Sequence, residues 1–110
     1  MSKIVYFASP YGDKDPNVVE KRFQETSKMV AILVSQGFVV ISPIVYGHTL
    51  LKYQEMPSDW DFWKNFCQSF LLKCEEMIVF KIDGWDRSTG VKGEIEIAEK
   101  MGMKITYMEP

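Results

Sequence analysis

Short apolar runs alternate with longer amphipathic segments along the whole chain, and this alternation restricts the possible folds more than any other feature. The short runs are rich in β-branched and aromatic residues and end near Pro, Gly or Asp, as strands do. We expect strands at 3–8, 38–41, 77–82 and 103–107. The longer segments repeat apolar residues at helical spacing, which predicts helices at 16–36, 59–74 and 90–101. Strands separated by helices are typical of a parallel sheet with right-handed crossovers.

This alternation predicts a single α/β domain over 1–110, a three-layer, doubly wound (flavodoxin-like or Rossmann-like) parallel sheet of four to five strands. In such sheets ligands bind beyond the carboxyl ends of the strands, near the point where the strand order reverses. The loops at 9–15, 42–58 and 83–89 follow three of the strands. The second loop is long and has no regular period over 44–58, which is typical of functional loops. A ligand site built from these three loops is therefore expected.

Composition restricts the class of protein and its partners. The chain has 46% apolar and 25% charged residues, close to the globular average, and a formal net charge of -2. It has no basic excess for binding a nucleic-acid polymer, and no apolar run of about 20 residues that could cross a membrane. The N-terminus lacks the order of a secretory signal, so we expect a cytoplasmic protein.

Cysteine and histidine are too few and too scattered to predict a metal site. Cys67 and Cys74 are expected on one helix, where seven positions correspond to about 10.5 Å, too far for a disulfide. His48 is the only histidine, and two thiols without a nearby Cys-x-x-Cys pattern make a poor zinc site. We therefore expect neither a metal nor another cofactor.

Glu94 is the sharpest candidate for chemistry, because it lies in the second turn of the last helix, close to the expected ligand edge. Unpaired amides at the start of a helix favour an ionised carboxylate and also bind anions such as phosphate. The alternative is an ordinary surface glutamate. Tyr6 could likewise be a core aromatic residue, and Ser9 and Tyr11 could simply form a turn. His48 could be a surface histidine rather than an acid or base.

Aromatic residues are unusually frequent at 58–63, the expected start of the second helix. Trp60 and Trp63 are expected to pack in the core, but an indole at the ligand edge could instead stack on a base. Asp83 and Asp86 follow the third strand, where α/β enzymes often keep a carboxylate. Helix capping and solvation are the alternatives for these two residues.

Three short motifs, in this order and spacing, carry a resemblance to a known superfamily. They are Val5-Tyr6-Phe7-Ala8-Ser9-Pro10-Tyr11, Ser42-Pro43-Ile44 and Ser88-Thr89-Gly90-Val91-Lys92-Gly93-Glu94. With them the chain resembles, over nearly its whole length, the nucleoside 2-deoxyribosyltransferase superfamily, which includes deoxynucleoside 5′-monophosphate N-glycosidases. It is similar to a group of short bacterial and phage members that share the Asp-Trp-x-Phe-Trp segment, present here at 59–63.

The resemblance implies cleavage of the N-glycosidic bond of a 2′-deoxynucleoside or its monophosphate through a covalent glycosyl-enzyme. Glu94 would be the nucleophile on C1′, and Tyr6 would orient it. The presence of Ser88 where relatives have an aspartate favours a monophosphate, because a hydroxyl can donate to phosphate where a carboxylate would repel it. The residues expected to contact the substrate are Ser9, Pro10, Tyr11, Ser42, His48, Trp63, Cys67, Ser88 and Gly90.

Cys67 departs from the superfamily pattern, which usually has an aspartate there that helps to protonate the leaving base. Asp61, Asp83 or Asp86 could take over this role. The alternative function is a non-catalytic protein that sequesters or senses a nucleotide, and a third is a flavodoxin-like interaction domain without a small ligand. Larger members receive a site residue from a neighbouring subunit, and we expect a homo-oligomer here.

Overall fold

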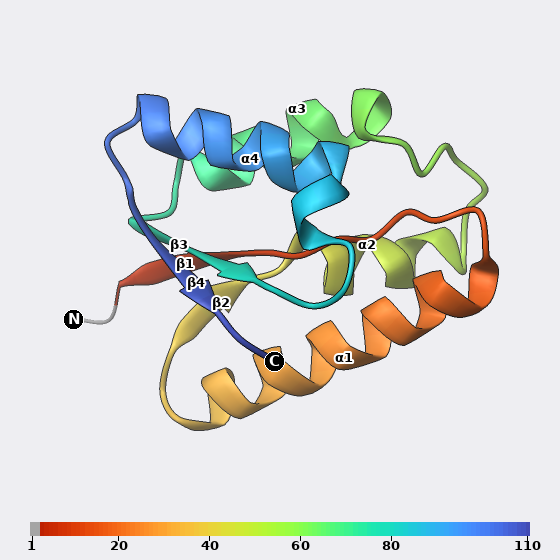
Figure 1. Ribbon diagram of the computed structural model, residues 1–110, viewed down its shortest axis with the longest axis horizontal. Helices are drawn as coiled ribbons and strands as arrows, with labels where there is room; N and C mark the ends of the chain where they lie inside the picture. Colours follow the sequence, from red (N-terminus) through yellow and green to blue (C-terminus); the bar gives the residue numbers. More distant parts are fainter. Residues whose placement is uncertain (1–2) are drawn as a thin grey trace.

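The computed structural model describes residues 3–110, which form a four-stranded, all-parallel sheet with helices on both faces (Figure 1). The strands are β1 (Ile4–Ala8), β2 (Val39–Ile41), β3 (Glu76–Phe80) and β4 (Lys104–Met108), in the order β2-β1-β3-β4. The helices are α1 (Pro16–Ser35), α2 (Pro43–Leu51), α3 (Trp60–Leu71) and α4 (Thr89–Lys100), with a short 3-10 helix, η1 (Trp85–Arg87). The predicted three-layer α/β parallel sheet is confirmed, and each strand begins and ends within two residues of its expected position. Among residues 3–110, no helix has both the length and the apolar character needed to cross a membrane.

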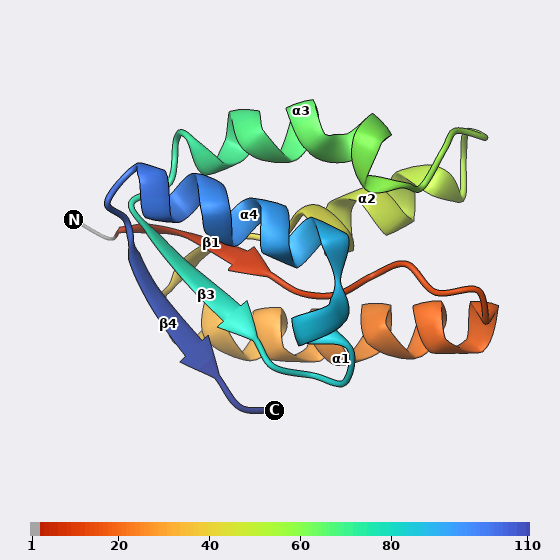
Figure 2. The same cartoon turned by 45° about the horizontal axis from the view of Figure 1, so that its top comes forward.

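Successive side chains of the central strand β1 point to opposite faces of the sheet and build two separate cores. Phe7 packs in a cluster with Leu33 of α1 and Phe80 of β3. Tyr6 packs on the other face in a cluster that contains Leu71 of α3. Figure 2 shows the same division, with α1 on one side of the sheet and α3 and α4 on the other. Both faces are covered, and the central strands β1 and β3 are accordingly apolar except for Glu76 at the start of β3.

The predicted start and end of α1 are confirmed. The Asp15 carboxylate accepts a hydrogen bond of 2.9 Å from the Asn17 amide, and Pro16 begins the helix, where its missing N–H costs nothing. Gly37 lies just beyond the helix with φ +95°, a left-handed conformation that favours glycine. The chain therefore turns sharply at Gly37 and enters β2.

A helix at Pro43–Leu51 corrects the prediction of an irregular loop over 44–58. The Ser42 hydroxyl accepts a hydrogen bond of 3.3 Å from the Val45 amide, and Pro43 follows at the first helical position. The Ser-Pro pair therefore ends one strand and also starts a helix. The helix is short and Gly47 interrupts its apolar pattern, so no helical periodicity is visible in the sequence.

Cys74 does not share a helix with Cys67, so this sequence prediction is wrong. α3 ends at Leu71, and the Cys74 amide donates to the Leu71 carbonyl at 3.0 Å in the turn that leads to β3. Both cysteines are buried and free, and the Cys74 thiol donates to the Phe70 carbonyl at 3.3 Å. The prediction of an irregular loop over 83–89 is also corrected, because the short helix η1 occupies the middle of this segment.

Leu71→Ala is expected to lower the free energy of unfolding by about 2–5 kcal/mol, because it opens a cavity between α3 and the sheet. Leu71 is 0% exposed and belongs to the core on that face. Leu72→Ala is the matched control: its side chain is 54% exposed, so the change should stay within about 0.5 kcal/mol. Urea denaturation of both variants measures the difference, and equal losses would contradict this packing of α3.

Candidate functional site

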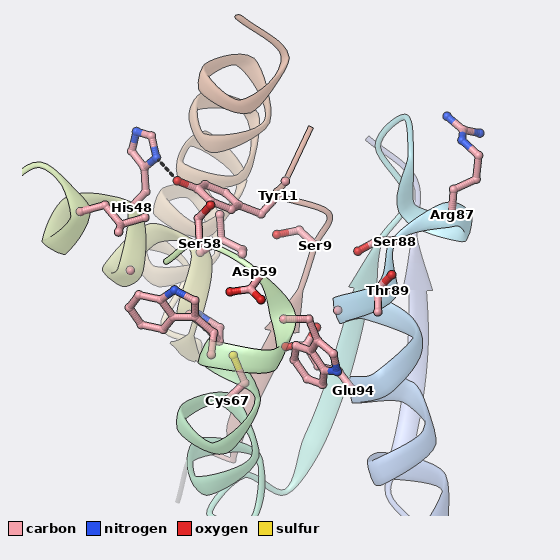
Figure 3. A pocket seen from close by; sticks show the side chains of 18 residues that line it. Ser9, Tyr11, His48, Ser58, Asp59, Cys67, Arg87, Ser88, Thr89 and Glu94 are labelled. Carbon is pink, nitrogen blue, oxygen red and sulfur yellow. Dashed lines mark hydrogen bonds between the residues drawn. The ribbon is translucent and has the colours of Figure 1, made fainter. Parts of the chain in front are cut away.

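A pocket of about 290 Å³ lies at the carboxyl edge of the sheet, beside the point where the strand order reverses (Figure 3). β2 pairs with one edge of β1 and β3 pairs with the other edge, so the strand order reverses at β1. The pocket walls come from the chain after β1, from α2, from the start of α3 and from the corner between η1 and α4. The prediction that three loops meet at this edge is confirmed by the residues that line the pocket.

Glu94 combines burial with a position on the pocket wall. It projects from α4, is 6% exposed, and accepts a hydrogen bond from the Tyr6 hydroxyl of β1. None of the ion pairs among residues 3–110 includes Glu94. Burial raises the pKa of the Glu94 carboxyl to about 8, although the Tyr6 hydrogen bond acts in the opposite direction. The carboxyl group is therefore largely protonated at neutral pH.

The prediction that helix-terminal amides keep Glu94 ionised is wrong. The Ser88 hydroxyl already accepts the hydrogen bond of the Val91 amide at 3.2 Å in the first turn of α4. Glu94 lies one turn further along, and the effect of a helix terminus falls off within the first turn. The loss of hydration on burial therefore decides the protonation state of this carboxyl group.

Tyr6 lies behind Glu94 and not on the pocket surface. Its side chain is 0% exposed and packs in the core that α3 and α4 share with the sheet. Burial, followed by the negative charge of Glu94, holds the pKa of Tyr6 far above its usual value, so its hydroxyl remains a donor. Tyr6 is thus both a core residue and the side chain that fixes Glu94 against the central strand.

Cys67 contributes a neutral thiol to the pocket wall. It projects from α3, and burial, followed by the charge of Glu94, raises its pKa to about 12. A thiol that holds its proton so firmly is a poor proton donor and a poor base at neutral pH. Cys67 therefore cannot replace an aspartate in acid–base chemistry.

Asp59 is the aspartate that lines the pocket. The carboxylates expected to substitute for an aspartate at this site do not line the pocket; they are Asp61, Asp83 and Asp86. Asp59 directly precedes α3 but makes no capping hydrogen bond with its side chain. Figure 3 shows its carboxylate directed towards the middle of the pocket. A carboxylate at this position is available to a ligand.

Two indoles line the pocket, and each lies against a glycine of a neighbouring helix. A Cβ atom on Gly93 of α4 would lie 2.5 Å from Cζ2 of Trp60, so the close approach requires glycine. A Cβ atom on Gly47 of α2 would meet Trp63 at an ordinary distance of 3.5 Å. The Trp63 N–H donates to the Pro57 carbonyl at 2.8 Å, which fixes the second indole.

The part of the pocket around the start of α4 is polar. The Ser88 oxygen accepts the hydrogen bond of the Val91 amide, which leaves the Ser88 O–H free to donate. Arg87 and Thr89 line the same part. Ser9 is 4% exposed, and its hydroxyl has no hydrogen-bond partner within the described part of the chain. Figure 3 shows Ser9, Ser88 and Thr89 around this end, an arrangement that suits an anion.

Tyr11 and His48 form a third part of the wall. The Tyr11 hydroxyl lies 2.7 Å from His48 Nδ1 (Figure 3), and His48 Nε2 lies 3.2 Å from Glu20 Oε1 of α1. The Phe23 ring stacks on the imidazole with 4.0 Å between ring centroids. Glu20 and Phe23 come from the middle of a surface helix, and nothing in the local sequence marks them as neighbours of a site.

The structure brings most of the predicted substrate-contacting residues to this pocket. Those that line it are Ser9, Tyr11, His48, Trp63, Cys67, Ser88 and Gly90. Pro10 and Ser42 are corrections: Pro10 is fully buried and the Ser42 hydroxyl caps α2, and neither lines the pocket. Arg87 and Thr89 also line it, and both belong to the loop over 83–89 that is expected at this edge. Among residues 3–110, no group of three or more His, Cys, Asp and Glu side chains is arranged to hold a metal ion.

Sheet and pocket together define a small three-layer α/β protein with a candidate site at the carboxyl edge of a parallel sheet. Residues 3–110 match the model of a family described as Domain of unknown function (DUF1937), and the chain belongs to this family. No curated protein matches the chain.

Gly93→Ala is expected to destabilise the protein by about 1–3 kcal/mol, because the added methyl group would displace the Trp60 indole. Gly47→Ala is the matched control, since it also lies within a helix but leaves an ordinary distance to Trp63. The gain in helix propensity should leave Gly47→Ala as stable as the wild type or slightly more stable. Thermal unfolding and tryptophan emission of both variants measure the effect, and equal stabilities would contradict the close packing of Trp60.

Glu94→Gln is expected to stabilise the protein increasingly as the pH rises from about 5 to 8. The pKa of Glu94 is raised from 4.5 to about 8 by burial, so the wild type loses stability as the unfolded chain ionises across this interval. Above the pKa of Glu94 in the folded protein this loss of unfolding free energy is complete and amounts to about 5 kcal/mol. Glutamine does not ionise, so the Glu94→Gln variant does not lose this stability. Unfolding free energies at several pH values check this, with the exposed Glu96→Gln as control, and a pH-independent difference would contradict the burial of Glu94.

Proposed function

We propose that the chain binds a nucleoside or nucleoside monophosphate and cleaves its N-glycosidic bond, with Glu94 as the nucleophile on C1′. The observation that carries the proposal is the Glu94–Tyr6 pair: a buried carboxyl group, oriented by a hydrogen bond, on the wall of a pocket of about 290 Å³. A carboxylate held in this way can form a covalent glycosyl ester, and water or a second base can then release the sugar.

The division of the pocket supports a nucleotide ligand. The indoles of Trp60 and Trp63 offer flat apolar surfaces on which a base can stack. The start of α4 offers Ser88, with a free O–H donor, beside a helix terminus that favours negative charge. The buried Ser9 hydroxyl would find its hydrogen-bond partner in a sugar or phosphate oxygen. Glu94 lines the same pocket, where it could reach C1′ of a nucleotide bound in this way.

The resemblance to the nucleoside 2-deoxyribosyltransferase superfamily agrees with this proposal. The glutamate and tyrosine that act together there match Glu94 and Tyr6, and in this chain the two side chains share a hydrogen bond across 88 positions of sequence. Ser88 faces the same pocket, as a monophosphate substrate requires. Hydrolysis or deoxyribosyl transfer, a homo-oligomeric state and a cytoplasmic location are parts of the same proposal.

A non-catalytic nucleotide-binding protein is the second candidate function. The observation that favours it is the neutrality of two groups in the pocket: burial raises the pKa of Glu94 to about 8 and that of Cys67 to about 12. A protonated carboxyl group and a thiol can both donate hydrogen bonds to a ligand, but neither attacks carbon efficiently in that state. Binding without turnover would then be the expected outcome.

Incubation of the purified protein with each deoxynucleoside and its 5′-monophosphate should release free base, detected by chromatography. Glu94→Gln should lower the rate by about a thousandfold or more, because it removes the nucleophile. Tyr6→Phe should lower it by about 10–100-fold, because the carboxyl group loses its orienting hydrogen bond. Ionisation of Glu94 by itself should make the rate rise with pH towards about 8, as the carboxyl group of the free protein loses its proton.

Glu96→Gln is the control for this experiment, because Glu96 lies on the same helix but is exposed, and its variant should match the wild type. Thermal shifts with the same nucleotides separate the two candidate functions, since ligand binding stabilises the native state with or without turnover. A nucleotide-induced shift without base release would support the binding protein. The absence of both would contradict both functions.

A further inference from the structure

Three side chains from separate elements form a continuous hydrogen-bonded chain that leads from the pocket to α1. Tyr11, in the segment after β1, has its hydroxyl 2.7 Å from His48 Nδ1 of α2 (Figure 3). His48 Nε2 lies 3.2 Å from the Glu20 carboxylate of α1. Tyr11 and His48 line the pocket and Glu20 does not, so the Tyr11–His48 end of this relay is the one that a ligand can reach.

The imidazole at the centre of the relay is held in one orientation. The Phe23 ring stacks on it at 4.0 Å with an interplanar angle of 28°, and the His48 side chain is only 12% exposed. The charged groups that face this stack are Glu20, which is hydrogen-bonded to His48, and Lys52, which directly follows α2 and whose ammonium lies 5.4 Å from the Phe23 ring centroid. The fixed ring keeps Nδ1 directed at Tyr11 and Nε2 directed at Glu20.

The protonation of His48 decides where the Tyr11 hydroxyl proton points. In both states the Glu20 carboxylate accepts a hydrogen bond from the Nε2–H group. When Nδ1 has no proton, it accepts the hydrogen bond of the Tyr11 O–H, and Tyr11 then donates no hydrogen bond to the pocket. When Nδ1 is protonated, it donates to the Tyr11 oxygen and frees the Tyr11 O–H for a ligand. Burial, followed by the charge of Glu20, raises the pKa of Tyr11, so the phenol keeps its own proton in both states.

We propose that Tyr11, positioned and reprotonated by His48 and Glu20, protonates the base that leaves in the reaction proposed above; the inference rests on that proposed function. As the C1′–N bond breaks, its electron pair moves to the base nitrogen, which takes the Tyr11 hydroxyl proton. The Tyr11 oxygen takes the Nδ1 proton of His48, and a Glu94 oxygen forms the new bond to C1′. Water then attacks C1′ and releases the Glu94 carboxylate, and the water proton returns to His48 Nδ1 through Tyr11.

Two other groups on the wall that could carry a proton, Cys67 and Asp59, are less suited to this transfer. Cys67 keeps its proton, because burial raises its pKa to about 12. Asp59 is exposed at the start of α3, and within residues 3–110 its side chain has no hydrogen-bonded partner that could return a proton to it. Tyr11 is the pocket hydroxyl that is joined to a histidine and through it to a carboxylate. Protonation of a leaving group by a positioned side chain typically contributes about 10²–10⁴-fold to the rate.

The test compares two substrates that differ in their need for a proton: a purine deoxynucleoside monophosphate that the wild type cleaves, and the same nucleotide methylated at N7. The methylated base carries a positive charge and leaves as a neutral molecule without being protonated. Tyr11→Phe and His48→Gln should lower the rate on the ordinary nucleotide by about 100-fold. On the methylated nucleotide both variants should stay within about threefold of the wild type. Tyr53→Phe is the matched control, because Tyr53 is 85% exposed and outside the pocket, and it should change neither rate.

A second measurement does not depend on turnover. His48 is the only histidine of the chain, so its ring nitrogens give unambiguous NMR signals. In the neutral wild type, the proton should be on Nε2, facing Glu20, and Nδ1 should report a hydrogen bond that Tyr11→Phe removes. A neutral ring protonated on Nδ1 would overturn the relay, because the proton would then face Tyr11 permanently.

The outcomes distinguish the relay from the function on which it rests. Equal slowing of both substrates by Tyr11→Phe would mean that Tyr11 only shapes the pocket and would overturn the proposal. A selective loss with Asp59→Asn and none with Tyr11→Phe would assign the proton transfer to Asp59 and would also overturn it. Either result leaves the N-glycosidase proposal intact. If the wild type releases base from neither nucleotide, the proposed function fails and the relay fails with it.

Discussion

The burial of Glu94 against Tyr6 is the constraint on which the arrangement of the pocket depends. Glu94 is 6% exposed and forms no ion pair with a cationic side chain among residues 3–110. Its ionised form therefore lacks a stabilising positive charge, and burial raises its pKa. In the proposed reaction the missing charge would appear at C1′ as the glycosidic bond breaks. The carboxylate would then be stabilised most when the substrate is most like an oxocarbenium ion, which is the condition for catalysis rather than for tight binding of the ground state.

The parallel sheet explains why helix starts surround this carboxyl group. Each strand delivers its chain to the same edge, and α2, α3 and α4 all begin there. Ser42 and Ser88 use their hydroxyls to cap the helices that follow them, and these starts are closed by local hydrogen bonds. Asp59 stands at the start of α3 without capping it, and Ser9 has no partner in the described chain. Asp59 and Ser9 both line the pocket, where a ligand can use these polar groups.

The sequence predicts the layers well because the evidence for them is local. Apolar runs such as 38–41, the Asp15-Pro16 start and the turn at Gly37 each depend on a few neighbouring residues. The site is predicted only in part. Glu94 is predicted from its position near a helix start, and its role with Tyr6 comes from the superfamily resemblance. The protonation of Glu94 depends on its burial by segments that are far apart in the chain, which position in a helix does not reveal. Glu20 carries no local signal at all, because only the tertiary fold places α1 beside His48. Arg87 is predicted only as part of the loop over 83–89.

The position of β1 at the centre of the sheet has a consequence for synthesis of the protein. β1 precedes β2 and β3 in the chain, yet it pairs with both, so both of its edges stay open on the ribosome until its neighbours emerge. Its residues, Ile-Val-Tyr-Phe-Ala, include no charge that would discourage pairing with another nascent chain. The apolar character that suits β1 to the middle of the folded sheet therefore makes it an aggregation-prone segment of the nascent chain. The yield of soluble protein during rapid expression depends on how long β1 stays unpaired before β2 and β3 are synthesised.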